Sequence, residues 1–444
     1  MGNHVIILAA GQGSRMASDT AKVLHEVAGF PLIAHALRAA EALAPERVIV
    51  VTGHEAAAVE AAVAEHAPEA TCVRQTEQLG TGHAVLQAEG ALAGAEGQAF
   101  VLYGDTPFIR AETLEAMAEA PADFAVLGFE GDPAARYGRL VTSGDVLERI
   151  VEWKDADETT RAGTLMNSGV LRGDVQAMLQ LLREVGNDNA AGEYYLTDLP
   201  ALAASRGLTT HVVRCDEAET LGINTRAELA RAEAAFQARA RAEALETGVT
   251  LVAPDTVHFA LDTHIGRDAL IEQHVVFGPG VTVESGARIR AFSHLEGAHV
   301  SRGATVGPYA RLRPGAELSE DVHVGNFVEV KNALIAEGAK VNHLSYIGDA
   351  DIGERTNIGA GTITCNYDGV FKHRTVVGAR AFIGSNTMLV APVNVGDEAV
   401  TGSGSVITAD VAAGDLALGR ARQVAKPGLG RKMMERLRAL KAKG

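Results

Sequence analysis

The chain has 444 residues, of which 47% are hydrophobic and 22% charged, and its formal net charge is −16. This length allows two or three domains with real hydrophobic cores. The acidic balance argues against a nucleic-acid-binding surface, because neutralising phosphates requires clustered Lys and Arg. No stretch is apolar for long enough to form a signal segment or a membrane span, so we expect a cytoplasmic protein without a membrane partner.

The first distinctive stretch is LAAGQGSRM, residues 8–16, which follows the apolar run HVII. A Gly-rich turn after a strand can bring backbone N–H groups close to phosphate, because glycine carries no side chain. The stretch fits neither the dinucleotide fingerprint, which needs a third Gly where Met16 stands, nor the P-loop, which needs Gly-Lys-Ser/Thr. It therefore predicts a phosphate-binding loop of another kind.

Up to about residue 225, apolar runs such as RVIVV, AFVLY and FAVLGF alternate with Ala-rich helical stretches. Such runs are typical of strands buried on both faces, and their alternation with helices predicts an α/β domain of parallel βα units over residues 1–225. Helical spacing then continues to Gly248, with a capping-box pattern at Thr225 and Glu228. We interpret residues 226–248 as a connector helix.

Residues 249–444 follow a different pattern, in which apolar residues recur every six positions. The recurring positions include Ile265, Ile271, Phe277, Val283, Ile289, Leu295, Val306, Leu312, Leu318, Val324, Val377, Ile383, Leu389, Val395 and Ile407. A six-residue period with small residues at the turns is a specific signal for a parallel β-helix of hexapeptide repeats.

The six-residue period breaks at 295–306, at 324–335 and around TCNYDGVFKHRTV. Stacked hexapeptide coils form a triangular prism, and at each break we expect a loop that leaves this prism. Breaks in a repeat are where functional residues concentrate. The basic tail, residues 431–443, is interpreted as a solvated terminal helix.

Seven motifs occur in this order along the chain: LAAGQGSRM, LGTGHA, YGD, VEWKDA, NFVEV, NHLSYIGDA and IGAGTITCNYDG. Their combination resembles bacterial bifunctional enzymes that join a UDP-N-acetylglucosamine pyrophosphorylase to a glucosamine-1-phosphate N-acetyltransferase. The resemblance covers nearly the whole chain. It implies a Rossmann-like nucleotidyltransferase domain, a long helix, and a left-handed β-helix acetyltransferase domain that assembles as a homotrimer.

The function implied by this resemblance is the synthesis of UDP-N-acetylglucosamine in two steps. Glucosamine-1-phosphate is first N-acetylated with acetyl-CoA. N-acetylglucosamine-1-phosphate then receives a uridylyl group from UTP, and pyrophosphate is released.

Uridylyl transfer depends mostly on positioning and on neutralising the charge of the phosphates. Arg15 can hold the departing pyrophosphate, and the resemblance places Lys22 on phosphate as well, so both are catalytic candidates. Asp105 follows the run AFVLYG, at the kind of strand end where open α/β sheets bind ligands. The resemblance makes Asp105 a Mg²⁺ ligand together with Asn224.

Other residues of the first domain are candidates for binding UTP or UDP-N-acetylglucosamine. Gln75 can pair with uracil through both of its amide groups, beside the Gly80-Thr81 pair. The resemblance places the N-acetylglucosamine part on Gly138, Glu152 and Asn167. The remaining candidates are Leu8, Ala9, Ala10, Gly11, Gly13, Tyr103 and Gly104.

Acetyl transfer needs a base for the amine, donors for the oxyanion, and cations for the sugar phosphate. The resemblance makes His343 the general base, with Glu329 as its electrostatic partner. It places glucosamine-1-phosphate on Arg313, Lys331, Tyr346, Asn357 and Lys372. Acetyl-CoA is expected at Ala360, Asn366, Tyr367, Ser385, Ser403 and Arg420.

Two other functions fit parts of the sequence. One is a single-activity sugar-1-phosphate nucleotidyltransferase whose β-helix serves only assembly or regulation, but such a module needs neither the His of NHLSYIGDA nor the CNYDG insertion. The other is a purely structural β-helix protein, which leaves the first 225 residues unexplained.

Overall fold

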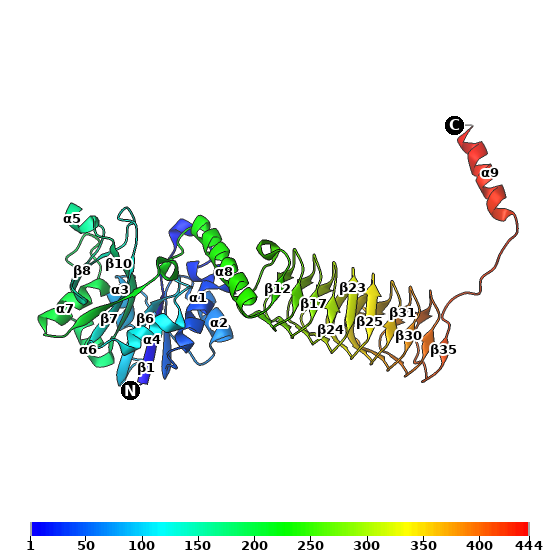
Figure 1. Cartoon of the computed structure of the whole chain (residues 1–444), viewed down its shortest axis with the longest axis horizontal. Helices are drawn as coiled ribbons and strands as arrows, with labels where there is room; N and C mark the ends of the chain where they lie inside the picture. The colour runs from blue at the N-terminus through cyan, green and yellow to red at the C-terminus, as the bar shows by residue number, and fades with distance from the viewer. Residues whose placement is uncertain (1, 443–444) are drawn as a thin grey trace. The chain divides into compact units, whose positions relative to one another are not determined.

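The computed structural model describes residues 2–442, and the chain divides into two compact units, one ending at Arg239 and the other beginning at Ala240 (Figure 1). In the first unit, the described strands include a nine-stranded sheet. Its order is β5 (Thr71–Arg74), β4 (Arg47–Thr52), β1 (Gly2–Ala9), β6 (Gly97–Tyr103), β10 (Leu165–Asp174), β7 (Phe124–Glu130), β11 (Thr210–Cys215), β9 (Val146–Val151) and β8 (Arg139–Ser143). A small antiparallel pair, β2 (Glu26–Val27) and β3 (Phe30–Pro31), lies outside this sheet.

Helices cover both faces of the nine-stranded sheet, and β1 supplies apolar side chains to both. Val5 and Ile7 pack with α1 (Leu32–Glu41), α2 (Ala56–His66) and α4 (Ala111–Glu119). Ile6 and Leu8 pack with α3 (Thr81–Leu86), α6 (Val175–Leu182) and α7 (Leu199–Ser205). Since alternate residues of a strand point to opposite faces, a continuous apolar run is what a strand covered on both sides requires. Short helices complete the unit: η1 (Ser14–Met16), η2 (Lys22–Leu24), α5 (Glu158–Arg161), η3 (Leu196–Asp198) and η4 (Glu217–Thr220).

The sheet is mixed, whereas the sequence pattern predicted parallel βα units. Strands β5, β4, β1 and β6 are mutually parallel, and β11 is parallel to β7. Strand β10, however, runs antiparallel to both β6 and β7 in the middle of the sheet. The β8–β9 hairpin precedes β10 and occupies the place of a crossover helix, so the chain enters β10 in the opposite direction.

Helix α8 (Arg226–Glu246) begins as the capping pattern predicted, with one change. The backbone N–H of Glu228 donates to Thr225 Oγ1 (3.2 Å), but the Glu228 carboxylate accepts from the N–H of Asn224 (2.7 Å) and not from that of Thr225. Phe236, on this helix, is 6% exposed and its ring lies edge-on to His35 of α1. The division between the two units falls within α8, so its first part belongs structurally with the first unit.

The second unit is a parallel β-helix whose described strands form three faces (Figure 1). The first face contains β12 (Thr250–Leu251), β14 (Leu270–Ile271), β17 (Arg288–Ile289), β20 (Thr305–Val306), β23 (His323–Asn326), β25 (Lys340–His343), β27 (Asn357–Ile358), β30 (Phe382–Ile383), β33 (Val400–Thr401) and β35 (Leu416–Ala417). The second contains β13 (His264–Ile265), β16 (Thr282–Val283), β19 (Ala298–Val300), β22 (Ala316–Leu318), β29 (Thr375–Val377) and β32 (Val393–Val395). The third contains β15 (Val276–Phe277), β18 (His294–Leu295), β21 (Arg311–Leu312), β28 (Ile363–Cys365), β31 (Met388–Val390) and β34 (Val406–Ile407).

Two longer strands, β24 (Glu329–Ile335) and β26 (Tyr346–Ile352), turn a corner of the prism and pair with strands of both the second and the third face. The six-residue series fills the interior as predicted: Ile271, Ile289, Val306, Val324 and Ile383 are each fully buried. Ile265, in one of the first coils, is only partly buried.

Two of the three expected loops are absent from the described residues, and that prediction was wrong. In 295–306 and in 324–335, one apolar spacing shortens to five residues, and the chain stays in the prism. A single residue with positive φ turns each shortened corner, Gly297 at φ 51° and Asn332 at φ 45°. Only the third break forms a loop, in which Tyr367, Val370 and Phe371 are exposed.

The described part of the basic tail belongs to α9 (Leu429–Lys441), which Figure 1 labels near the C-terminus, and Lys443 lies outside the described residues. The side chains of α9 are all exposed in the single chain. No helix in residues 2–442 combines the length and the apolar character needed to cross a bilayer.

Candidate active sites

The predicted phosphate-binding loop leaves β1 at the edge where β6 also ends. Leu8 and Tyr103 are register partners on these two strands, so the Gly-rich loop and Asp105 emerge side by side. The space beside Gly11 is open, since a Cβ there would meet no atom within 4 Å. At Gly13, where φ is 63°, a Cβ would lie 2.6 Å from Lys22 Cβ. Gly13 is therefore needed both for the turn and for the close approach of Lys22.

Four predicted residues converge at this edge of the sheet. Lys22 Nζ donates to the Asp105 carboxylate and, at 3.1 Å, to Asn224 Oδ1. Arg15 Nη2 donates to the same Asn224 oxygen at 2.8 Å. The side chains of Lys22 and Asp105 are 14% and 17% exposed, so the ion pair is largely shielded from water. Residues far apart in the chain thus bring two cationic side chains close to the Asp105 carboxylate and the Asn224 amide oxygen.

A pocket of about 320 Å³ opens beside this cluster. Its lining includes the predicted residues Leu8, Ala9, Ala10, Gly11, Lys22, Gln75, Gly80, Thr81, Tyr103 and Asp105. Sequence reasoning missed four further lining residues, the apolar Val23 and Ala84 and the polar Gln78 and Glu193. Gln78 lies in the EQLGTGHA segment that supplied Gln75 and Gly80, and its Nε2 donates to Ala10 O at 2.8 Å. Nothing in the sequence around Glu193 singled it out. The predicted Gly104 is not among the lining residues, and its N–H donates to Leu8 O.

Gln75 has its amide partly engaged already. The side chain is only 5% exposed, and Nε2 lies 3.0 Å from both Gly80 O and His83 Nδ1. The expectation that Gln75 pairs with uracil through both amide groups therefore does not fit this geometry. Only its carbonyl oxygen is left for a ligand.

The three residues expected at the sugar form a second group. The N–H of Asn167 donates to Gly138 O at 2.9 Å, and a Cβ at Gly138 would lie 3.6 Å from both Asn167 Cβ and Glu152 Oε1. Thr197 Oγ1 donates to Glu152 Oε1 at 3.1 Å. Burial raises the pKa of Glu152, although the bond from Thr197 acts the other way.

Tyr103 links this group to the pocket. Burial raises the pKa of its phenol, and the negative charges of Asp105 and Glu152 raise it further. Tyr103 also lines the pocket, so its phenol is a pocket residue that senses the charge of both carboxylates.

In the β-helix, His343 stands in a line of residues that runs along the prism. Val341, Ile358, Ile383 and Thr401 are successive register partners on the first face. The residues two positions beyond them are His343, Ala360, Ser385 and Ser403. Arg420 approaches the end of this line, because its Cδ lies 3.9 Å from a Cβ placed on Gly404. The coils thus bring four residues expected at acetyl-CoA onto one edge with His343.

The partner of the His343 ring is Asn326, which sequence reasoning missed. Asn326 Oδ1 lies 2.7 Å from His343 Nδ1, one coil away in register. Glu329, the expected partner, accepts instead from Arg313 Nη1 at 2.8 Å. Asn326 is the first residue of the NFVEV motif, so the signal for it was present in the sequence.

Two lysines predicted to contact glucosamine-1-phosphate, Lys331 and Lys372, lie near Asp349, a carboxylate that was not predicted. Lys331 Nζ is 3.9 Å from Asp349 Oδ2, and the neighbouring Lys372 lowers the pKa of Lys331, as burial also does. Burial raises the pKa of Asp349, but hydrogen bonds from Asn332 and Asn366 and the charges of Lys331 and Lys372 together outweigh it and leave that pKa low. Two lysines held this close together form a ready anion site.

The remaining predicted residues of this site divide between two faces. Asn366 Nδ2 donates to Asp349 and lies 3.5 Å from the Tyr346 hydroxyl. Tyr367 is 60% exposed on the loop, and its hydroxyl donates to Gly369 O. Asn357 lies on β27, on the first face with His343, and pairs in register with Lys340. A shallow groove of about 430 Å³ beside Glu329 and Tyr346 also includes Leu344, which follows His343.

Comparison with known proteins finds relatives of the first unit and of the whole chain. Residues 5–221 match the family model of MobA-like NTP transferase domains. Over its whole length the chain is 68% identical to the bifunctional protein GlmU of Dinoroseobacter shibae, with 100% of both chains covered. It is 68% identical to the same protein of Ruegeria sp. TM1040, covering 100% of this chain and 99% of that one, and 67% identical to that of Paracoccus denitrificans, with 98% of each covered.

This chain belongs to the GlmU family. It is a bifunctional enzyme that makes UDP-N-acetylglucosamine by N-acetylating glucosamine-1-phosphate and then transferring a uridylyl group. The match to the nucleotidyltransferase model ends at residue 221, before α8, and the identity to GlmU proteins continues through the β-helix. These matches exclude both alternative hypotheses, a single-activity nucleotidyltransferase and a purely structural protein.

Proposed function

We propose that the two units divide the two reactions between them, with uridylyl transfer in the pocket beside β1 and acetyl transfer beside His343. The convergence of Arg15, Lys22, Asp105 and Asn224 beside a 320 Å³ pocket, which Lys22 and Asp105 line, supports the first assignment. The line that joins His343 to Ala360, Ser385 and Ser403 supports the second.

For uridylyl transfer, the Gly-rich loop receives the UTP phosphates, and Arg15 and Lys22 neutralise charge on the departing pyrophosphate. Asp105 and Asn224 would hold Mg²⁺, which would supply further charge neutralisation. A carboxylate and an amide oxygen suit this hard cation, and in the structure both already face one cationic group, Lys22 Nζ. The sugar phosphate is oriented by the Gly138, Glu152 and Asn167 group.

For acetyl transfer, Arg313, Lys331 and Lys372 bind the phosphate of glucosamine-1-phosphate. His343 removes the proton from the amine as the amine attacks the thioester of acetyl-CoA. The co-substrate lies along Ala360, Ser385, Ser403 and Arg420, while Asn366 and Tyr367 contact the acetyl end.

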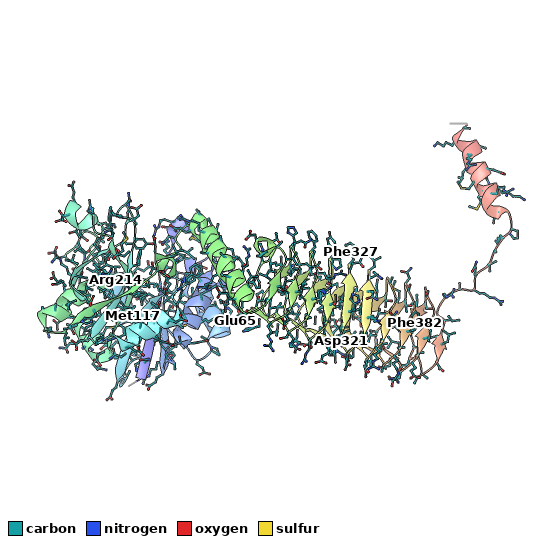
Figure 2. The ribbon with its side chains drawn as sticks, viewed as in Figure 1. Glu65, Met117, Arg214, Asp321, Phe327 and Phe382 are labelled. Carbon is teal, nitrogen blue, oxygen red and sulfur yellow. The ribbon has the colours of Figure 1, made fainter. Side chains whose placement is uncertain are left out.

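We also propose that the enzyme is a cytoplasmic homotrimer. On the β-helix, the rings of His274, Phe292, Tyr309 and Phe327 stack in a column with centroid spacings of 4.8, 4.9 and 5.3 Å. Phe327 is 55% exposed in the single chain, and Figure 2 shows it on the outside of the β-helix. An exposed aromatic column of this kind supports burial by a partner subunit. Light scattering of the Phe327→Asp variant tests this assignment, since a mass equal to that of the native enzyme would contradict it.

The division of labour is tested by measuring both half-reactions on the same purified variants. Asp105→Ala removes a proposed metal ligand, so we expect uridylyl transfer to be lost and acetyl transfer to remain. His343→Ala removes the base, which typically costs about 10²- to 10⁴-fold in rate, and we expect that loss in acetyl transfer alone. A variant that loses both activities would contradict the assignment of its residue to one site.

A further inference from the structure

We infer that His83 is a specificity-determining residue of the nucleotide pocket. It accepts a hydrogen bond from Gln75, fixes the orientation of the Gln75 amide, and thereby selects uracil over cytosine. The inference rests on the proposed function, because it takes the pocket beside β1 to be the site of UTP. His83 itself is a positioning residue, since it acts on the base through Gln75.

The surroundings of Gln75 permit only one orientation of its amide. Its Nε2 position lies 3.0 Å from Gly80 O, and a carbonyl oxygen can only accept a hydrogen bond. The atom facing Gly80 is therefore the nitrogen. The second N–H of the amide meets His83 Nδ1 at 3.0 Å, so both donors of Gln75 are used.

The carbonyl oxygen of Gln75 is left for a ligand. Within residues 2–442, Gln75 Oε1 has no hydrogen-bond partner, yet it is not among the unpaired atoms that are sealed from solvent. The residue is 5% exposed and lines the 320 Å³ pocket. A buried side chain thus presents to the pocket a single polar atom, which can only accept.

An acceptor at this position distinguishes the two pyrimidines. The ring nitrogen N3 of uracil carries a hydrogen and donates, whereas N3 of cytosine has a lone pair and accepts. With the base held in one pose by its ribose and phosphates, Gln75 Oε1 bonds to uracil N3–H but faces a second acceptor in cytosine. A buried polar atom left without its partner is what gives such sites their selectivity.

Cytosine would fit only if the Gln75 amide turned over. Its Oε1 would then face Gly80 O and His83 Nδ1, two acceptors, so both contacts oppose the turn. His83 supplies one of these two contacts. Without it, only Gly80 O would hold the amide in place.

The His83 ring must then carry its hydrogen on Nε2. The Gln87 amide nitrogen lies 3.2 Å from Nε2 and also donates to His83 O at 3.1 Å. A neutral imidazole accepts at one nitrogen only. Gly80 O fixes the orientation of the Gln75 amide, so His83 Nδ1 must accept from it. The Gln87 amide is not fixed in this way. It can turn over and accept from His83 Nε2–H, and it then loses its bond to His83 O.

The test is the ratio of kcat/KM for UTP to that for CTP, measured on the full chain. His83→Phe keeps a ring without an acceptor, His83→Leu removes the ring, and His83→Asn restores an oxygen acceptor near the position of Nδ1. Losing one neutral hydrogen bond should lower the ratio roughly two- to tenfold in the Phe and Leu variants. The Asn variant should recover most of it. His66→Leu, at the end of α2, is the matched control.

A purely structural role would lower both kcat/KM values together and leave their ratio unchanged. An unchanged ratio in both the Phe and Leu variants, or an equal fall in the Asn variant, would overturn the inference. Acetyl transfer and thermal unfolding of each variant show whether the chain is folded. If the native enzyme forms no nucleotide sugar from UTP, the proposed function fails instead, and this outcome is seen before any variant is made.

Discussion

Asn326 Oδ1 and His343 Nδ1 lie 2.7 Å apart on adjacent coils of the β-helix. An amide oxygen accepts, so the Nδ1 atom of the ring must carry the hydrogen and Nε2 is left with its lone pair. Asn326 thus sets the tautomer in which His343 can take a proton through Nε2. If His343 is the base that we propose, a neighbour orients it as the second member of a hydrolytic triad is oriented.

Removing Asn326 should weaken acetyl transfer without affecting uridylyl transfer. In Asn326→Leu, the ring loses the partner that fixes its tautomer, and we expect kcat for acetyl transfer to fall about tenfold, the value of one hydrogen bond of roughly 1.4 kcal/mol. Asn326→Asp keeps an acceptor and should retain most of the activity. Steady-state kinetics of both variants decide the point, and equal activity of Asn326→Leu and the native enzyme would contradict it.

Lys331 should act through phosphate binding and not through chemistry. A hydrogen bond to a charged group contributes about 1.5–3 kcal/mol, so Lys331→Met should raise KM for glucosamine-1-phosphate roughly 10- to 150-fold with a smaller effect on kcat. Lys340→Met is the control, because Lys340 is an exposed lysine on the neighbouring face. A fall in kcat at unchanged KM would show that Lys331 does not bind the ground-state substrate.

Glu152 should lower the stability of the folded chain at neutral pH and much less at low pH, although we propose that it holds the sugar. Burial raises the pKa of this carboxyl, so its favourable contribution to folding is complete below the unfolded pKa and is lost as pH rises through the folded pKa. Glu152→Gln should therefore raise Tm relative to the native enzyme at pH 7 and much less at pH 4. The same change should weaken uridylyl transfer if Glu152 holds the sugar.

Glu148→Gln provides the matched comparison for Glu152, because Glu148 is exposed on β9, just before it in the chain. We expect no rise in Tm at pH 7 for this variant. A Glu152→Gln variant whose Tm tracks that of Glu148→Gln across the pH range would contradict the effect of burial.

A fragment of residues 2–239 should be more stable than one of residues 2–225. The longer fragment retains Phe236, packed on His35, and the bond from Ala28 N to Glu233 Oε2 (2.7 Å). Full burial of an aromatic side chain contributes about 1.5–3 kcal/mol, so urea unfolding should show a difference of at least that size. Phe236→Ala in the longer fragment should remove much of the gain, and equal midpoints for the two fragments would refute this role of α8.

Much of the fold could be predicted because each half of the chain repeats a local rule. A strand buried on both faces must be apolar at every position, and a hexapeptide coil must place an apolar residue inward at each face, so both patterns are visible without tertiary information. The corners were harder to predict. Whether an extra or missing residue leaves the prism depends on whether one residue can adopt positive φ, as Asn332 does, and such residues are not confined to glycine.

The candidate sites were predicted through motifs, and the partners of their residues were not. The Gly-rich loop, Asp105 and His343 each stand in a distinctive local sequence that determined their selection. Only the folded chain decided that Lys22 bonds to Asn224, that Asn326 and not Glu329 meets the His343 ring, and that His83 holds Gln75. These pairings depend on register between strands and on the side-chain orientation that hydrogen bonding imposes, and both are set by contacts between residues that the linear sequence leaves far apart.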